Sequence, residues 1–430
     1  MNDGAFRDFE SNVRSYCRTF PAVFDRALGA LLWDEMGRRY IDFFAGAGAL
    51  NYGHNNPAIK RPVIEYLAAD RVLHALDMHT VAKREFLEAF ADRVLRPRGM
   101  SYRIQFTGPT GTNAVEAALK IVRRASGRAT VCAFRGGYHG MSLGSLAVTA
   151  NAEGRAAAGV ALAHSTFAPY ATDAPTWQAS LASLEAVLLD GHSGVDKPAA
   201  VILETVQAEG GINPAPIGWL RGVEALCRAH GMLLIVDDIQ VGCFRTGDFF
   251  SFEASGIRPD LVVLSKSIGG LGFPMSLVLI RPDLDLLKPG EHTGTFRGNQ
   301  IAFVAAKAAL EFADREQLGG VVLERAAQVE RFLTSRVLPL HPDISIRGRG
   351  LIWGVDVSRC GGPDLARAVG RDCFENGLII ERAGRNDTVL KIMPPLTIEP
   401  ALLEEGLTVL TDALDRAISP VRGAREPTAA

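Results

Sequence analysis

The stretch LLIVDDIQVG, residues 233–242, points most directly to the fold of this chain. Four apolar residues run without interruption into two carboxylates, Asp237 and Asp238. A short, continuous apolar run is typical of a strand covered on both faces, as in a parallel sheet, and acids at its end lie at the ligand-binding edge. Taken alone, the motif is compatible with three roles for these acids: pairing with a cationic ligand group, binding Mg²⁺ or capping a helix.

Similar apolar runs occur on both sides of this stretch. They occupy residues 102–107, 130–134, 201–205, 261–265 and 276–280. Helical patterns separate them, for example at residues 112–125 and 219–230, where apolar residues recur every three or four positions. This alternation predicts an α/β domain whose sheet is mostly parallel and covered by helices.

The pattern changes after about residue 299. Helices at 301–312 and 322–337 precede a smaller mixed region with a strand at 352–357 and helices near 365–376 and 402–418. We expect residues 46–300 to form the large domain, and 1–45 and 301–430 to form a smaller domain together. The tail at 422–430 has no periodicity and is expected to fray.

Composition narrows the range of functions. The 430 residues are 47% hydrophobic and 22% charged with a formal net charge of −2, so neither nucleic acid nor an anionic membrane is an expected partner. The first residues mix acids with bases and do not resemble a signal peptide, so we expect a cytoplasmic protein. The six cysteines are scattered without a CxxC pair, and buried apolar thiols are expected rather than disulfides or a zinc site.

Two further stretches carry chemistry. In FTGPTGTNAVEAALK, residues 106–120, a strand leads through Thr110, Gly111 and Thr112 into a helix whose free N–H groups suit a phosphate. Taken alone, the stretch is better explained as a capped helix after a tight turn. In PDLVVLSKSIGGLGFPM, residues 259–275, Lys266 ends an apolar strand. Desolvation there would lower the pKa of Lys266 and favour a nucleophilic amine, whereas many strand-end lysines simply extend to solvent.

The order and spacing of these motifs resemble the class III (ω-amino acid) aminotransferases, from about residue 15 to 413. The motifs that carry the resemblance are GYHG (137–140), the pattern at 204–211, DDIQ (237–240), the Lys266 segment, GTFRGN (294–299) and MPPLTI (393–398). The resemblance implies pyridoxal 5′-phosphate (PLP) as cofactor. It also implies fold type I, with a mostly parallel seven-stranded sheet in the large domain and a smaller α+β domain built from both chain ends.

The resemblance also implies a role for each matching residue. Lys266 would form the Schiff base with the cofactor and move the substrate proton, and Asp237 would pair with the pyridinium nitrogen. The other expected cofactor contacts are Thr110, Gly111 and Thr112 at the phosphate, Tyr138 and Ile239 on the ring faces, Gln240 at the ring hydroxyl, and His139 in support of Tyr138.

The resemblance also implies a role for Thr295 at a subunit interface. Thr295 is similar to the threonine that reaches the phosphate of the neighbouring subunit in this family. This likeness implies a homodimer whose active sites are completed across the interface, or a dimer of such dimers.

Departures from the general family pattern concern the substrate. Glu209 is present, but Lys391 stands where most members have the arginine that binds the substrate α-carboxylate, so the geometry must differ. Two roles are open for Lys391: it binds a substrate carboxylate, or it forms a purely structural ion pair with Glu209. Arg297, on a loop, offers a second cation for a substrate carboxylate or simply faces solvent.

Four residues, Thr205, Asp238, Arg297 and Lys391, resemble the diaminobutyrate–2-oxoglutarate branch of the family. That branch transfers the terminal amino group between L-2,4-diaminobutyrate and the 2-oxoglutarate/glutamate pair. Ala208 and Phe244 fit it less well, and we expect them to add bulk near the site.

Three alternatives to this substrate assignment stay open. They are another diamino acid or natural-product amine as donor, an aminomutase or racemase of the same fold, and a non-catalytic relative. The retention of Lys266 and Asp237 argues against the last of these.

Overall fold

A seven-stranded sheet forms the centre of the computed structural model, which describes residues 4–172 and 177–423. Its order is β4-β12-β11-β10-β7-β5-β6, and β12 alone runs in the direction opposite to the other six strands. The strands are β4 (Arg103–Phe106), β5 (Val131–Phe134), β6 (Ser165–Ala168), β7 (Ala200–Leu203), β10 (Leu233–Asp237), β11 (Leu261–Leu264) and β12 (Leu277–Ile280). The α/β fold with a mostly parallel sheet is therefore confirmed.

The sequence predicts six of these strands to within two residues at each end. The strand it misses is β6, at the edge of the sheet, where only Ala168 is fully buried. An edge strand has less of its surface covered, so Ser165 and Thr166 are tolerated and the apolar run that marks the inner strands is absent.

Both faces of the sheet are covered, as the continuous apolar runs require. Alternate residues of β10 point to opposite sides: Ile235 packs with helix α6 (Gly111–Ser126), whereas Leu234 and Val236 pack with α10 (Ile217–Ala229) and α5 (Val81–Phe90). Each strand therefore contributes to two cores. This double burial keeps the carboxyl ends of the strands in fixed positions.

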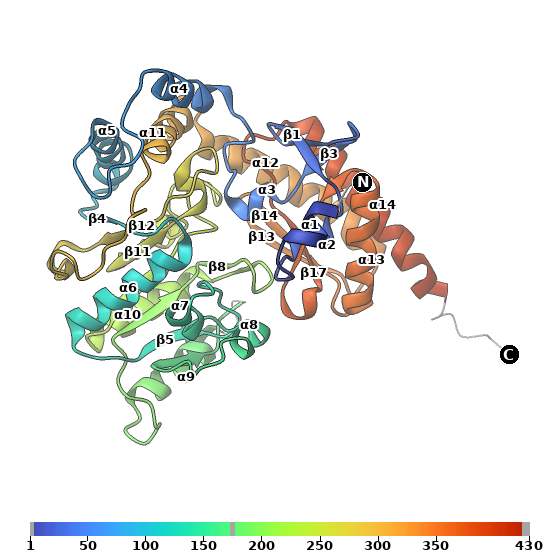
Figure 1. Cartoon of the computed structure of the whole chain (residues 1–430). Helices are drawn as coiled ribbons and strands as arrows, with labels where there is room; N and C mark the ends of the chain where they lie inside the picture. Colours follow the sequence, from blue (N-terminus) through green and yellow to red (C-terminus); the bar gives the residue numbers. More distant parts are fainter. Residues whose placement is uncertain (1–3, 173–176, 424–430) are drawn as a thin grey trace.

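The small domain is built from both ends of the chain, and in Figure 1 the blue N-terminal segment lies beside the red C-terminal helices. One sheet joins the N-terminal strands to a C-terminal one, in the order β1 (Phe24–Leu28), β2 (Leu31–Asp34), β3 (Arg39–Asp42) and β15 (Leu378–Ile379). A second sheet contains β13 (Ser345–Arg349), β14 (Ile352–Asp356), β17 (Val389–Ile392) and β16 (Glu381–Ala383), in that order.

Three long helices cover these two sheets. They are α12 (Leu318–Phe332), α13 (Gly362–Glu375) and α14 (Pro400–Gly423). Because α14 continues through Gly423, the start of the expected tail at Arg422 is helical, contrary to the prediction. The rest of that predicted tail, 424–430, lies outside the described residues.

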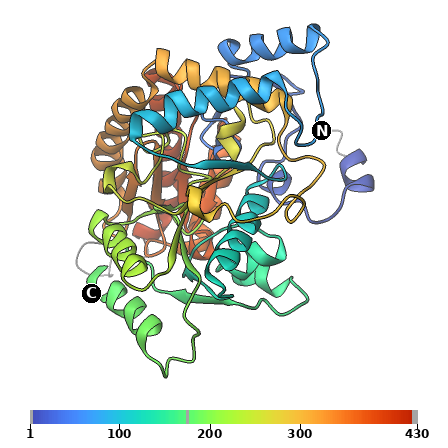
Figure 2. The same ribbon diagram turned by 90° about the vertical axis from the view of Figure 1, so that its left-hand side faces the viewer.

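Helix α11 (Gln300–Arg315) packs against α4 (Pro57–Ala68) and α5, and the three lie together in Figures 1 and 2. It contributes Phe303 to the core of the large domain and Ala309 to that of the small domain. The division of the chain at residues 45 and 300 stays a prediction.

The remaining elements include α9 (Trp177–Leu189), which packs against α10, and several short helices and strands. The short ones include α1 (Gly4–Phe9), α2 (Tyr16–Thr19), α3 (Ala45–Gly48), α7 (Leu143–Ala147), α8 (Ala152–Ala156), β8 (Val206–Gln207) and β9 (Asn213–Pro214). Among the helices described, none has both the length and the apolar character needed to cross a bilayer.

Candidate active site

The carboxyl ends of the parallel strands converge on a cavity of about 330 Å³. Strand β10 delivers Asp237 to it, the segment after β11 delivers Lys266, and the loop after β5 delivers Tyr138 and His139. Ten residues predicted for the site line the cavity: Thr110, Gly111, Thr112, Tyr138, His139, Glu209, Asp237, Ile239, Gln240 and Lys266. Parallel strands place side chains from distant parts of the sequence at one edge, as the sequence analysis expects.

Lys266 begins a 3-10 turn directly after β11. Its φ of 54° lies in the left-handed region, which costs a non-glycine residue free energy and is frequent at functional positions. Burial lowers the pKa of the Lys266 amine, and the nearby Glu209 carboxylate offsets this only in part. Lys266 therefore has the neutral, nucleophilic tendency that the sequence predicts.

Asp237 is bound to His139, an arrangement the sequence does not anticipate. His139 Nδ1 lies 2.7 Å from Asp237 Oδ2, and both side chains are buried. Although burial alone would lower the pKa of His139, the hydrogen bond and charge of Asp237 raise it above its ordinary value. His139 thus fixes the Asp237 carboxylate, and its expected support of Tyr138 stays a prediction.

The two acids of the DDIQ motif have different partners. Asp238 accepts a hydrogen bond from the Ser251 amide at 3.1 Å and another from the Ser251 hydroxyl. Burial raises the pKa of Asp238 to about 7, with the Ser251 hydrogen bonds opposing it. Asp237 alone of the two lines the cavity.

Glu204 is a cavity residue to which the sequence analysis assigns no role of its own. Its Oε1 accepts a hydrogen bond of 3.0 Å from the Tyr138 amide, which holds the loop after β5 against the end of β7. Burial raises the pKa of Glu204 to about 7, against the opposing charge of His139. Its place directly after an apolar strand is the signal that would have identified it.

The N-terminus of α6 closes one end of the cavity. A Cβ on Gly111 would lie 2.8 Å from Ile239 Cδ1, so this position admits no side chain without displacing Ile239. Thr112 Oγ1 lies 2.7 Å from Ser142 Oγ, and Glu116 accepts a hydrogen bond from Ser142 at 2.7 Å. Backbone N–H groups and hydroxyls therefore surround the helix end, where the helix dipole favours an anion such as a phosphate.

Gln240 has one satisfied and one unsatisfied polar atom. Its Nε2 donates to Glu209 Oε1 at 3.1 Å and to the Ala47 carbonyl at 3.0 Å. Its Oε1 is buried and has no hydrogen-bond partner in the part of the chain that the structure describes. A buried acceptor without a partner fits a donor supplied by a bound molecule, such as a ring hydroxyl.

Lys391 lies beneath the cavity in a buried ion-pair cluster. Its Nζ is 2.8 Å from Glu209 Oε1 and 2.6 Å from Glu381 Oε2, and its side chain is fully buried. Burial alone would lower the pKa of Lys391, but the charges of Glu209 and Glu381 outweigh it and hold the pKa above the ordinary value. Conversely, Lys391 and Lys266 overcome the effect of burial on Glu209 and lower its pKa to about 2.

The cluster includes two residues that the sequence analysis does not name. Glu381 lies on β16 opposite Lys391 of β17, a neighbour that only strand pairing reveals. Tyr16, on α2, faces the same cluster: burial, followed by the carboxylates of Glu381 and Glu209, raises the pKa of its phenol. The N-terminal segment therefore lies beside the site.

Four expected residues lie away from the cavity. Thr295 is exposed on the loop before α11, where its carbonyl accepts a hydrogen bond from His74. Arg297 lines a different cavity and donates to the His292 carbonyl at 2.7 Å. Ala208 is buried in the small-domain contact, and Phe244 packs edge-on against Phe249. Neither Ala208 nor Phe244 lines the cavity, although Ala208 directly precedes the lining residue Glu209, and the effect of their bulk on the donor stays a prediction.

The residues that line the cavity fit PLP. A glycine at a helix N-terminus can hold the phosphate, Asp237 can pair with a protonated ring nitrogen, and Gln240 Oε1 can accept from the ring hydroxyl. Lys266 extends into the same cavity as the amine for covalent attachment. Tyr138 and Ile239, which also line it, supply the surfaces expected for the two ring faces.

Comparison with known proteins agrees with this geometry. Residues 13–414 match the family described as aminotransferase class-III. The chain is 51% identical over 416 residues to a diaminobutyrate–2-oxoglutarate transaminase of Bordetella parapertussis, covering 96% of this chain and 95% of the relative. It is 54% identical over 409 residues to an enzyme of the same name from Streptomyces anulatus, covering 94% and 96%.

Solved structures show the same fold. An ornithine aminotransferase from Toxoplasma gondii, with PLP at partial occupancy in its active site, superposes with a TM-score of 0.84 at 28% identity. The match covers 97% of this chain and 94% of the other. The chain belongs to the class III aminotransferases, PLP-dependent enzymes of fold type I.

Proposed function

We propose that this enzyme catalyses reversible transfer of the terminal amino group of L-2,4-diaminobutyrate to 2-oxoglutarate, forming aspartate 4-semialdehyde and glutamate. The observation that carries the proposal is the 51–54% identity, over nearly the full length of both chains, to transaminases of that name. Identity of this extent, together with the intact Lys266 and Asp237, makes the same reaction the best supported one.

The chain's own residues supply acid–base chemistry and orientation. PLP, when bound, provides an electron sink for the negative charge left when a proton leaves the amine carbon. Lys266 Nζ, whose pKa is lowered by burial, takes that proton and returns it. The Asp237 carboxylate, fixed by His139, stabilises a positive charge on the ring nitrogen.

One site must accept both a diamino acid and a dicarboxylate, and we assign this dual specificity to Glu209 and Lys391. When a neutral part of the donor occupies the site, Glu209 stays on Lys391, as at the observed 2.8 Å. When 2-oxoglutarate binds, its carboxylate replaces Glu209 on Lys391, so the cation keeps two anionic neighbours. The rival role for Lys391 is a purely structural ion pair.

Thr295 and Arg297 are proposed to act across a subunit interface. Exposed apolar side chains gather around the loop that carries them: Phe296 is 68% exposed and lies edge-on to His74, and Leu73, Met78 and Val81 are also exposed. An apolar surface of this kind is typical of a protein–protein interface. We infer a homodimer in which Thr295 reaches the partner's phosphate site and Arg297 offers a cation for a substrate carboxylate, with a tetramer as a further level of assembly.

We also propose that the enzyme works in the cytoplasm. Five of its six cysteines are buried in apolar surroundings, and burial raises the pKa of those at 132, 227, 243 and 373. Such thiols are typical of a reducing compartment. Expression with a fluorescent tag, with the distribution compared with that of the tag alone, tests this location.

The proposed reaction is tested with the PLP-loaded enzyme and single amines in the absence of 2-oxoglutarate. L-2,4-Diaminobutyrate is expected to bleach the visible absorption band of the lysine-bound cofactor, and addition of 2-oxoglutarate should restore it with one glutamate formed per turnover. Ornithine, which is one carbon longer, and 4-aminobutyrate, which lacks the 2-amino group, serve as alternative donors. If one of them reacts and diaminobutyrate does not, the donor assignment is wrong although the enzyme class stands.

The same experiment separates the alternative reactions. An aminomutase or racemase needs no external oxo acid, so sustained turnover of diaminobutyrate without 2-oxoglutarate would contradict the transaminase reading. A chain that takes up PLP but reacts with no amine would favour a non-catalytic relative. The variant Lys266→Ala is the control, because it should bind PLP without the covalent absorption band.

A further inference from the structure

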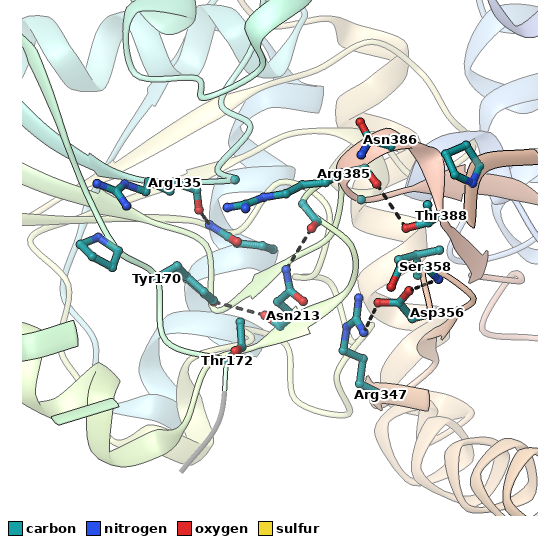
Figure 3. Close-up of a pocket in the computed structure, with 17 residues that line it drawn as sticks. Arg135, Tyr170, Thr172, Asn213, Arg347, Asp356, Ser358, Arg385, Asn386 and Thr388 are labelled. Carbon is teal, nitrogen blue, oxygen red and sulfur yellow. Dashed lines mark hydrogen bonds and ion pairs between the residues drawn. The ribbon is translucent and has the colours of Figure 1, made fainter. Parts of the chain in front are cut away.

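A second cavity lies at the junction of the two domains and shares no lining residue with the active site. Its volume is about 530 Å³, within the range of roughly 300–1,000 Å³ that is usual for small-molecule sites. Large-domain residues Arg135, Tyr170 and Asn213 face small-domain residues Arg347 and Arg385 across it (Figure 3).

The cavity carries an excess of positive charge. Three guanidinium groups line it, from Arg135, Arg347 and Arg385, and among the residues at 4–172 and 177–423 Asp356 is its only acidic lining residue. Asp356 Oδ2 lies 2.9 Å from Arg347 Nη1, so this carboxylate is already engaged with one of the three arginines. Within the described part of the lining, two positive charges therefore have no carboxylate partner.

The remaining two arginines are available to a ligand. No ion pair or side-chain hydrogen bond of Arg135 or Arg385 is formed with any residue among 4–172 and 177–423. Arg385 extends from the small domain across the cavity toward the large-domain side in Figure 3. A guanidinium held over a concave polar surface is well suited to bind carboxylate or phosphate oxygens in pairs.

Much of the rest of the lining is polar, and part of it is fixed in place. Asn213 Nδ2 donates to the Gly210 carbonyl at 3.0 Å, and Tyr170 Oη donates to the Glu204 carbonyl at 2.8 Å. Arg347 Nε donates to the Gly211 carbonyl at 2.9 Å, which orients its guanidinium. A fixed lining of this kind costs little conformational entropy when a ligand binds.

The cavity is joined to the active site through the chain that follows Glu209. The Gly384 amide, next to Arg385, donates to the Glu209 carbonyl at 2.9 Å. Arg347 holds the Gly211 carbonyl of the same segment. The backbone that carries Glu209 therefore forms part of the wall between the two cavities.

We propose that the domain-junction cavity binds a small anion with at least two negative charges, held between Arg385 and Arg347 of the small domain and Arg135 of the large domain. The anion bridges the two domains at a site separate from the one that holds the cofactor. Carboxylate and phosphate groups share the chemistry that these guanidiniums recognise, so the ligand is a di- or tricarboxylate or a phosphorylated metabolite.

Calorimetric titration of the PLP-loaded enzyme with citrate and, separately, with inorganic phosphate tests the proposal. We expect one of these probes to bind once per chain, and binding to weaken about tenfold or more in Arg385→Ala and in Arg135→Ala, since each loses a charge-assisted contact. Arg385→Lys keeps the positive charge but loses the paired N–H donors of the guanidinium, so its affinity for the probe should lie between those of the original enzyme and Arg385→Ala. The probe that binds decides between the carboxylate and phosphate sources.

The matched control is Arg367→Ala, which removes an exposed arginine on α13 that pairs with Asp364 and does not line the cavity. It should bind the probe like the original enzyme. Binding that is equal in Arg385→Ala and the original enzyme would overturn the proposal. So would failure of both probes to give more heat than sodium chloride at the same ionic strength.

Discussion

Asp237 and Asp238 are neighbours in sequence with different environments. Asp237 lines the cavity and is bound to His139, whereas Asp238 accepts hydrogen bonds from Ser251 outside it. Their side chains leave opposite faces of the chain at the end of β10, as successive strand residues do. The apolar run places both acids at the right edge of the sheet, and the direction in which each side chain leaves the strand end puts Asp237 in the cavity, as the family resemblance implies.

Replacement of each acid by its amide tests this difference. Asp237→Asn removes a charge that stabilises the ring nitrogen, so kcat should fall by roughly 10²–10³, as for other lost electrostatic contacts in active sites. Asp238→Asn is the matched control and should lower kcat less than about threefold, measured with saturating substrates. Equal losses in the two variants would contradict the assignment of Asp237.

Asp238 also predicts a pH dependence of stability. Its carboxyl has a pKa of about 7 in the folded chain, against an ordinary value of 3.8, so the folded state binds more protons between these pH values. The contribution of Asp238 to the free energy of unfolding is therefore present at low pH and is lost as the pH rises toward 7. Over that range the free energy of unfolding falls by up to about 1.4 kcal/mol per pH unit. Glu204, with a pKa of about 7, acts in the same direction.

Urea unfolding of the original enzyme and of Asp238→Asn between pH 5 and 8 measures this contribution. The variant lacks the titrating group, so its free energy of unfolding should fall less steeply with rising pH. Parallel profiles for the two proteins would mean that Asp238 is ionised at low pH in the folded state.

Lys391 is a cation shared by two carboxylates inside the protein. Lys391→Met leaves Glu209 and Glu381 without their counter-ion, and the free energy of unfolding should fall by about 3–5 kcal/mol. The triple variant Lys391→Met, Glu209→Gln, Glu381→Gln removes the unpaired charges and should recover much of the loss, measured by urea unfolding.

A second substitution at this position distinguishes the two roles open for Lys391. In Lys391→Arg, which keeps the charge, an altered KM for 2-oxoglutarate with an unchanged KM for the amine donor would support the carboxylate-binding role. An unchanged KM for both substrates in a stable variant would leave the structural ion pair as the sole role.

At the scale of elements, the N-terminus of α6 depends on the absence of a side chain at Gly111. In Gly111→Ala, the new Cβ would lie 2.8 Å from Ile239 Cδ1, so either Ile239 or the helix end must shift. Such overpacking costs about 1–3 kcal/mol, and we expect PLP affinity to fall roughly five- to hundredfold, measured by titration of the apoenzyme. Gly191→Ala is the control, since a Cβ there meets no atom within 4 Å.

The elements themselves are largely predictable, with informative exceptions. Inner strands such as β10 and β11 are continuous apolar runs because both of their faces are buried. The edge strand β6 and the short strands β15 and β16 lack that signal, since a two- or three-residue strand is defined by its neighbours. Glu381, on β16, was missed for this reason.

At the scale of the whole molecule, the proposed dimer rests on the exposed loop around Phe296. Phe296→Asp places a charge in the middle of this apolar surface and should shift the enzyme toward monomers in sedimentation at micromolar concentration, with loss of activity. Leu323→Asp, on the exposed side of α12 in the small domain, is the control and should leave assembly unchanged. A monomeric original enzyme with full activity would contradict the dimer.

The sequence by itself determines the α/β fold and most of the site at the sheet edge. Burial on two faces makes the strands apolar, and parallel strands bring their ends together, so Asp237, Lys266 and Gly111 can be placed without coordinates. The family resemblance then supplies the cofactor.

Only the tertiary structure decides which charges meet. The pairs His139 with Asp237 and Lys391 with Glu381, and the arginines that face each other across the domain junction, join segments from different elements. Side-chain partners depend on strand register and on how the two domains pack, and a local pattern records neither. For this reason the strand ends that line the cavity and the pair of Lys391 with Glu209 are predictable, whereas the second partner of Lys391, Glu381, and the domain-junction cavity are not.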